Sequence, residues 1–254
     1  MTPGPVLFAR YAYPPNALGY CGPADCGALL EYTAGQVSDA GLVALARQFA
    51  GAWPYLTLIA AANQRCDPLD PAVVEAYWLG SPLLERIEGR LFAAHVVDRF
   101  GERAGGHDTE LAELALAGGR AHHNFHVFAV YPWVGLLRAG HVDEPMRVLD
   151  SCRIRPGRVL SVHGGQAMVS SSPLAWTGRD LVLGPPCPQQ VRLSSGADHL
   201  APHVQVGDTV AVHWDWICDV LDTRQAARLR RYTRGQLRVA NRALHRPVAD
   251  LVLG

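Results

Sequence analysis

The segment "HHNFH", residues 122–126, combines residue types and a spacing that suit metal binding. On a helix, His122 and His126 lie one turn apart on the same face, which is a common geometry for two metal ligands, whereas His123 points elsewhere. A zinc protease of the HExxH type needs a glutamate directly after the first histidine, and His123 stands in that place, so this activity is excluded. Histidines inside an apolar helix also serve packing and hydrogen bonding. The segment therefore predicts either a metal or cofactor site or a packed histidine cluster.

The cysteines form a second group of chemically competent side chains: Cys21, Cys26, Cys66, Cys152, Cys187 and Cys218. The chain opens without the charged start and the cleavage site of a signal peptide, so we expect reduced thiols that serve packing, metal binding or redox chemistry. Cys21 and Cys26 flank a helix start expected at Pro23, where a helix N-terminus would favour a thiolate; packing is the alternative. Cys218, five residues after His213 on one expected strand, should lie on the opposite face and be buried.

The elements that must position these residues are helical in the N-terminal half. From residue 38 to about residue 138, apolar residues recur at three- and four-residue spacing, which is typical of helices with one buried face. The individual helix signals are Ser38 as an N-cap, Pro71 in a first turn, a start at Ser81-Pro82, the segment 107–119, and the segment 120–140 with a bend or an end at Pro132.

From about residue 140 the pattern changes to short strand-like runs separated by turn residues. The runs are "GRVLSV", "QAMVSS", "DLVL", "QVRLS" and "GDTVAVHWDWI". Strands of this length and spacing suggest a small antiparallel barrel, which buries its edges by closing. A last stretch returns to the helical pattern with Asp222 or Thr223 as its N-cap. We therefore predict an α+β protein with a mainly helical domain over residues 1–148, followed over residues 149–254 by a small antiparallel OB-like β-barrel with a basic C-terminal helix.

The stretch that begins at Cys152 contains a series of short blocks in a distinctive order. A cysteine is followed by three residues and then by Pro-Gly-Arg-Val, at 156–159. "GGQAMV" follows at 164–169, "VQVGDTVAVH" at 204–213 and "VLDTRQA" at 220–226. Over residues 150–226 the chain resembles the small hydrogenase assembly chaperones of the HypC/HupF type, whereas the N-terminal half is not placed by this resemblance.

The resemblance implies an accessory role in the maturation of nickel-iron hydrogenase. In that family the cysteine is a ligand to the iron that acquires cyanide and carbon monoxide, and a histidine near the final strand is functionally important; these roles fall on Cys152 and His213. The implied cofactor is iron, as an iron-cyanide-carbonyl unit, and the implied partners are the hydrogenase large-subunit precursor and an iron-sulfur maturation scaffold. A thiolate is a soft ligand suited to such iron, and the nearby Arg153, Arg155 and Arg158 are expected to lower the pKa of Cys152. His213 is expected to ligate, to hydrogen-bond a cyanide nitrogen or to relay a proton.

Composition narrows the remaining function classes. The formal net charge is zero, no apolar run is long enough to span a membrane, and the chain is expected in the cytoplasm. The closing helix carries arginines but no acidic residue between residues 224 and 246. These arginines form either a solvated face or a docking surface for an acidic partner. Nucleic-acid binding is not expected, because no aromatic platform accompanies them. We predict an assembly chaperone that is not an enzyme. The alternative is a metal-dependent enzyme that uses His122, His123 and His126, with the barrel as an interaction module.

Overall fold

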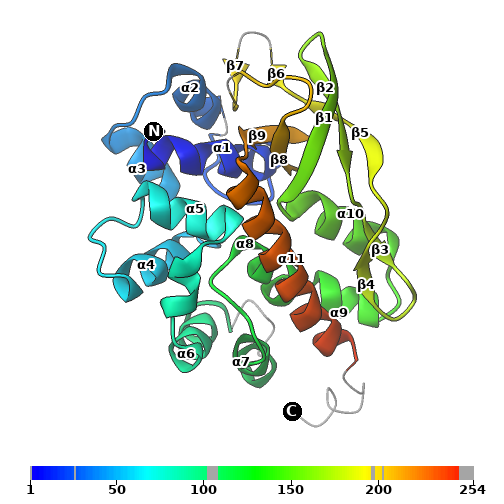
Figure 1. The fold of residues 1–254 in the computed structure, drawn as a ribbon. Coiled ribbons are helices and arrows are strands. Elements are labelled where there is room, and N and C mark those ends of the chain that lie inside the picture. Colours follow the sequence, from blue (N-terminus) through cyan, green and yellow to red (C-terminus); the bar gives the residue numbers. More distant parts are fainter. Residues whose placement is uncertain (1, 26, 102–107, 196–197, 202, 246–254) are drawn as a thin grey trace.

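The computed structural model describes residues 2–25, 27–101, 108–195, 198–201 and 203–245 (Figure 1). Its N-terminal half is helical, as predicted. The longer helices are α1 (Gly4–Ala17), α2 (Gly27–Gly35), α3 (Ala40–Arg47), α4 (Trp53–Ala62), α5 (Pro71–Leu79), α6 (Gly89–Phe100), α7 (Asp108–Leu116), α9 (Trp133–Arg138) and α10 (Asp143–Cys152). Shorter helical turns are η1 (Pro82–Arg86), α8 (His123–Phe125) and the π-helix η2 (His126–Val130).

Local capping signals explain where two of the predicted helices begin. Pro71 opens α5, where its missing amide hydrogen costs nothing, and the Asp70 carboxylate accepts a hydrogen bond from the Ala72 amide at 2.8 Å. The Ser81 hydroxyl caps η1 in the same way. Both starts are confirmed.

Two other predicted starts are wrong. Asp39, rather than Ser38, caps α3, because its carboxylate accepts a hydrogen bond from the Leu42 amide at 3.0 Å. The segment at Pro23 forms no helix start, since α2 begins at Gly27.

The strands of the C-terminal half form one main sheet and two short hairpins. The main sheet contains β1 (Arg155–His163), β2 (Gln166–Ser171), β5 (Cys187–Arg192), β9 (Trp216–Val220) and β8 (Thr209–His213), paired in this order, and β8 pairs again with β1. The pairs are antiparallel except β5 with β9, which is parallel, so the antiparallel prediction is wrong at this contact. The hairpins are β3 (Leu174–Trp176) with β4 (Leu181–Leu183) and β6 (Ser194–Ser195) with β7 (Asp198–His199).

The last predicted strand is in fact a tight hairpin. The chain leaves β8 at His213, turns through Trp214 and Asp215, and returns along β9. Trp214 has a φ of 54°, which supplies the left-handed step that a two-residue hairpin turn needs. Cys218 is buried as predicted, but it lies on β9 and not on the same strand as His213.

The C-terminal helix α11 (Thr223–Leu244) joins the two halves. Asp222 and Gln225 form a capping box at its start, which confirms Asp222 as the N-cap. The helix lies with α4 to α7 on one side and β1 and β2 on the other (Figure 1). One apolar core contains residues of the N-terminal helices, of β8 and β9, and of α11, while a smaller core fills the space inside the main sheet. None of the helices described has both the length and the apolar character that a membrane crossing requires.

Candidate metal centre

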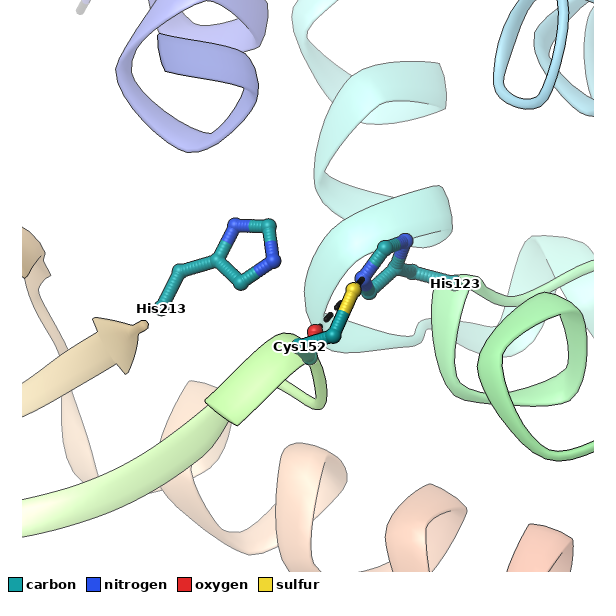
Figure 2. A group of neighbouring side chains, drawn as sticks. All are labelled: His123, Cys152 and His213. Atoms are coloured by element: carbon teal, nitrogen blue, oxygen red, sulfur yellow. Dashed lines mark hydrogen bonds between the residues drawn. The ribbon is translucent and has the colours of Figure 1, made fainter. Parts of the chain in front are cut away.

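Three buried side chains from distant parts of the chain meet where the helices join the main sheet (Figure 2). His123 is the first residue of α8, Cys152 is the last residue of α10, and His213 is the last residue of β8. One ligand atom of each lies within 4.8 Å of the ligand atoms of the other two. In the described part of the chain, no other group of three or more His, Cys, Asp or Glu side chains is arranged to hold a metal ion. The structure thus brings Cys152 and His213 together and adds His123, which was predicted to point elsewhere.

Hydrogen bonds hold the backbone beside Cys152 against the turn that follows His213. The Trp214 amide donates to the Ser151 carbonyl at 2.7 Å, and the Arg155 guanidinium donates to the Trp214 carbonyl at 2.7 Å. The end of α10 and the end of β8 are therefore cross-linked directly beside the two ligand candidates. This cross-link sets the separation of the thiol from the imidazole.

The arginines near Cys152 do not activate its thiol. Arg153 donates to the Asp150 carboxylate at 2.7 Å, Arg155 is turned toward backbone carbonyls, and Arg158 is exposed. Burial raises the pKa of Cys152 above its ordinary value. The prediction that these arginines lower the pKa of Cys152 is therefore wrong, because the guanidinium groups are engaged elsewhere and the thiol is removed from water.

The His213 ring is oriented by the backbone of α1. Its Nδ1 lies 2.7 Å from the Tyr11 carbonyl oxygen, and since a carbonyl can only accept, Nδ1 carries the proton. Nε2 is then left with a free lone pair. It is buried and has no hydrogen-bond partner within the described residues. A histidine that donates from one nitrogen to a backbone carbonyl and presents the other is the usual arrangement of a metal ligand.

The His123 ring is held by two groups. Its Nε2 lies 2.8 Å from the Cys152 carbonyl oxygen and 3.9 Å from the Cys152 Sγ atom, and its Nδ1 lies 3.3 Å from the Tyr77 hydroxyl. Because the carbonyl must accept, Nε2 carries the proton and Nδ1 accepts from Tyr77. His123 can therefore bind an ion through Nε2 only when the proton moves to Nδ1, which then donates a hydrogen bond to the Tyr77 hydroxyl oxygen.

The three side chains are uncharged at neutral pH. Burial lowers the pKa of His123 to about 4 and holds the pKa of His213 well below its ordinary value. Burial also keeps Cys152 protonated by raising its pKa. Neutral imidazole is the form that binds a metal, whereas a thiol must first lose its proton. The site can therefore accept a cation with the release of a single proton.

A cavity of about 180 Å³ adjoins two of the three ligand candidates, Cys152 and His123. Aromatic rings surround it and continue over both histidines, since the Trp78 ring centroid lies 4.7 Å from that of His123 and 5.9 Å from that of His213. Other residues that line the cavity are Phe49, Tyr77, His126, Tyr131 and Trp133. Three protein ligands leave one position of a tetrahedral site open, and the cavity offers room beside it for a small ligand.

The other two histidines of the segment 122–126 turn to different surroundings. His122 is the N-cap of α8, and its ring stacks on that of Tyr232 with the centroids 5.5 Å apart. His126 begins η2, and its Nδ1 lies 3.3 Å from the Tyr55 hydroxyl. Because His122 is an N-cap with extended backbone (φ −126°, ψ 145°) rather than a helical residue, the two do not form the predicted pair on one helical face. His123 takes the ligand position instead.

Cys21 lines the same cavity as Cys152, but it is not an activated thiolate. Burial raises the pKa of Cys21 to about 12, and the residue lies ahead of α2 rather than at a helix N-terminus. The thiolate hypothesis for Cys21 is therefore wrong, and packing is its role here. Cys26, the other cysteine of that segment, lies outside the described residues.

A family model matches residues 1–247, which is nearly the whole chain. The chain belongs to the DUF6390 family. This is a family of unknown function. The matched region includes the helical half as well as the strands, and therefore contains all three ligand candidates, His123, Cys152 and His213. A search of curated proteins and a search of solved structures found no match to the DUF6390 chain.

Proposed function

We propose that the chain is an accessory protein of metallocentre assembly that carries a transition-metal ion, as cargo, at His123, Cys152 and His213. The observation that carries the proposal is the Nε2 atom of His213. This nitrogen is buried, it has no hydrogen-bond partner within the described residues, and its ring is fixed by the Tyr11 carbonyl. A buried acceptor without a partner is costly, and a metal ion is the partner that it would share with the neighbouring thiol and imidazole.

The donor set favours a soft or borderline ion. One sulfur and two imidazole nitrogens suit iron, zinc or copper(I), whereas magnesium and calcium prefer oxygen. A tetrahedral ion with a metal–sulfur distance of about 2.3 Å and metal–nitrogen distances of about 2.0 Å separates its ligand atoms by roughly 3.5 Å. The three donors lie within 4.8 Å of one another, so small side-chain movements suffice. The resemblance to the HypC/HupF type selects, from this set, iron with its cyanide and carbonyl ligands.

His123 gives the site a way to release its cargo. Its Nε2 has two alternative partners, the Cys152 carbonyl, to which it donates at 2.8 Å, and an ion. When the ion leaves, this hydrogen bond restores a partner for the imidazole, and the thiol regains a proton. A carrier needs such an alternative, because a site that is stable only with its metal would retain it.

The fold supports the assembly role that the resemblance implies. β1 begins shortly after Cys152, and the main sheet closes through the pairing of β8 with β1, as expected for an OB-like barrel. We assign this barrel to the C-terminal half and a docking face to the helical half. The proposed partners are the hydrogenase large-subunit precursor and the iron-sulfur maturation scaffold, in the cytoplasm.

Infrared spectroscopy tests the cargo. The protein is purified anaerobically from a host that expresses the hydrogenase maturation machinery. We expect cyanide and carbonyl stretching bands in the wild type and their loss in Cys152→Ser and in His213→Gln. Cys187→Ser is the control, since it changes a half-buried thiol on β5 outside the site, and it should keep the bands.

Two results would count against the proposal. Bands absent from the wild type, in a preparation in which a HypC-type chaperone shows them, would exclude the iron unit as cargo. Bands of equal strength in the wild type and in both site variants would exclude Cys152 and His213 as its ligands.

A metal-dependent enzyme is the second candidate. The cavity beside Cys152 and His123 favours it, because an enzyme needs room for a substrate next to an open coordination position. The ligands would then be His123, Cys152 and His213, with His126 in the cavity wall. Complementation of a host strain that lacks this chain separates the two candidates: an assembly role requires Cys152→Ala to abolish hydrogenase maturation. Hydrogenase maturation that survives Cys152→Ala would favour the enzyme, because the enzyme's own reaction, and not maturation, would depend on Cys152 and His126.

A further inference from the structure

A second candidate site is a cleft of about 290 Å³ between the start of the main sheet and α11. Helix α11 lies against β1 (Figure 1), and residues of β1, β2 and α11 line the cleft. Its polar lining consists mainly of Arg153, Arg158, Ser170, Ser172, Arg230 and Arg234. Among the described residues, no acidic side chain lines the cleft. In a chain whose formal net charge is zero, this is a marked concentration of positive charge.

Three of the four guanidinium groups in the cleft have no countercharge. Arg153 is buried and paired with Asp150 at 2.7 Å, so its charge is compensated. Arg158, Arg230 and Arg234 are exposed, and within the described part of the chain none of them has an ion pair or a hydrogen bond from its side chain. Arg230 and Arg234 lie one turn apart on α11, where like charges repel.

Other arginines of α11 show that this lack of partners is specific to one face. Arg228 pairs with Glu75 at 3.2 Å, and Arg231 pairs with Glu85 at 3.2 Å. These two pairs fasten the helix to the N-terminal half. The face of α11 that borders the cleft has no equivalent acids, so its arginines form no ion pair within the described chain.

We propose that this cleft binds a small phosphorylated ligand, with Arg158, Arg230 and Arg234 on the phosphate oxygens. Guanidinium groups bind phosphate through paired hydrogen bonds, and three of them suit an anion with more than one charge. The hydroxyls of Ser170 and Ser172, which make no hydrogen bond within the described residues, supply further donors. The volume lies near the lower end of the range for small-molecule sites, about 300 Å³, and the lining holds no aromatic ring on which a nucleic-acid base would stack.

Isothermal titration calorimetry with inorganic pyrophosphate on the full chain tests the proposal. We expect saturable binding by the wild type at low ionic strength and a loss of affinity of about tenfold or more in Arg230→Gln/Arg234→Gln. Arg224→Gln/Arg238→Gln is the matched control: it removes the same charge from exposed positions of the same helix outside the cleft. The control should bind within about twofold of the wild type. Both double variants should unfold near the wild-type temperature, because none of the four arginines makes an ion pair or a side-chain hydrogen bond within the described residues.

Three outcomes would overturn the proposal. An absence of pyrophosphate binding by the wild type would remove the site, and an equal loss in the two double variants would mean that only the general charge of α11 attracts anions. Citrate that binds as tightly as pyrophosphate would assign the cleft to carboxylates rather than phosphates. Binding of a glutamate-rich peptide in place of pyrophosphate would make the cleft a docking surface for an acidic protein.

Discussion

The affinity of the proposed metal site should rise about tenfold for each pH unit between about pH 6 and about pH 8.5. Burial lowers the pKa of His123 to about 4 and holds the pKa of His213 well below its ordinary value, so both imidazoles are neutral throughout this range. Burial raises the pKa of Cys152, so the thiol keeps its proton over the same range. One proton therefore leaves whenever an ion binds. The tenfold change corresponds to about 1.4 kcal/mol of binding free energy per pH unit.

An exposed site built from the same residue types would behave differently. With ordinary pKa values of about 6.5 for histidine and about 8.5 for cysteine, up to about three protons would be displaced at low pH and almost none above pH 8.5. The affinity would then climb steeply below pH 6.5 and level off at high pH. A straight line with a slope near one, in a plot of the logarithm of the affinity against pH, distinguishes the buried site from an adventitious one.

Zinc competition against a chromophoric chelator of known pH dependence measures this slope, in the wild type and in Cys152→Ala. The variant lacks the ionising ligand, so its affinity should be lower and almost independent of pH. A slope of two or three near pH 6 in the wild type would refute the claim that both imidazoles are neutral at that pH. A plateau near pH 8 would refute the protonated, buried thiol.

Tyr77→Phe should lower zinc affinity about tenfold in the same assay, because the Tyr77 hydroxyl, 3.3 Å from Nδ1, is the acceptor that lets His123 present Nε2; an unchanged affinity would exclude His123 as a ligand. Acidification from pH 6.5 to pH 4 should destabilise the chain. The pKa of His123 in the folded chain, about 4, lies below its ordinary value of about 6.5. The unfolded chain therefore binds more protons in this window, and the free energy of unfolding decreases as the pH is lowered. His123 alone contributes about 3 kcal/mol to this loss, which urea unfolding of wild type and His123→Gln measures; a difference between them that does not change with pH would contradict the assignment. Asn124→Ala should lower the free energy of unfolding by about 3 kcal/mol, since its buried amide donates to the Thr233 hydroxyl at 2.9 Å and accepts from the Ile154 amide at 3.2 Å; urea unfolding that shows a loss below about 1 kcal/mol would contradict this cross-link.

Elements whose signals lie within a few residues could be predicted from the sequence. The Asp222 carboxylate caps α11, and Pro71 opens α5. The strand-like run "QAMVSS" predicted β2 with its observed bounds, Gln166–Ser171. In each case the deciding interaction is between near neighbours in the chain, such as a cap with an amide three residues on. The helical first half followed by strands and a final helix is thus readable from local chemistry.

The hairpin after His213 and the helix break near His126 have no comparable signal. Trp214 adopts a φ of 54°, a conformation in which glycine or asparagine is normally found, so the apolar run predicted one long strand. The helix begins after His122, whose backbone is extended, so a helical period of 3.6 residues does not apply between His122 and His126. This is why His126 was paired with His122.

The meeting of the ligand candidates depends on tertiary packing. His123 and Cys152 are 29 residues apart, and the resemblance that pointed to Cys152 and His213 does not extend to the half of the chain that contains His123. The sequence proximity of the arginines to Cys152 wrongly predicted an effect on its pKa, because the guanidinium group of a long side chain lies far from its own backbone. Arg153 reaches Asp150 and Arg155 reaches the Trp214 carbonyl, and neither changes the thiol.

The way the ligands are assembled determines what a metal ion can do for this chain. The His213 ring is fixed by a carbonyl 202 residues away, and the large core that holds α1, α5, α8 and β8 together is an extensive cluster of buried apolar side chains. Folding of this core therefore brings the three donors together before an ion binds, in contrast to small zinc domains, in which metal binding supplies the free energy of folding. Removal of a bound ion by a chelator should then leave far-ultraviolet circular dichroism and cooperative unfolding intact. A chain that unfolds on chelation would mean that the ion is a structural component, and a carrier that must empty and refill could not be built in that way.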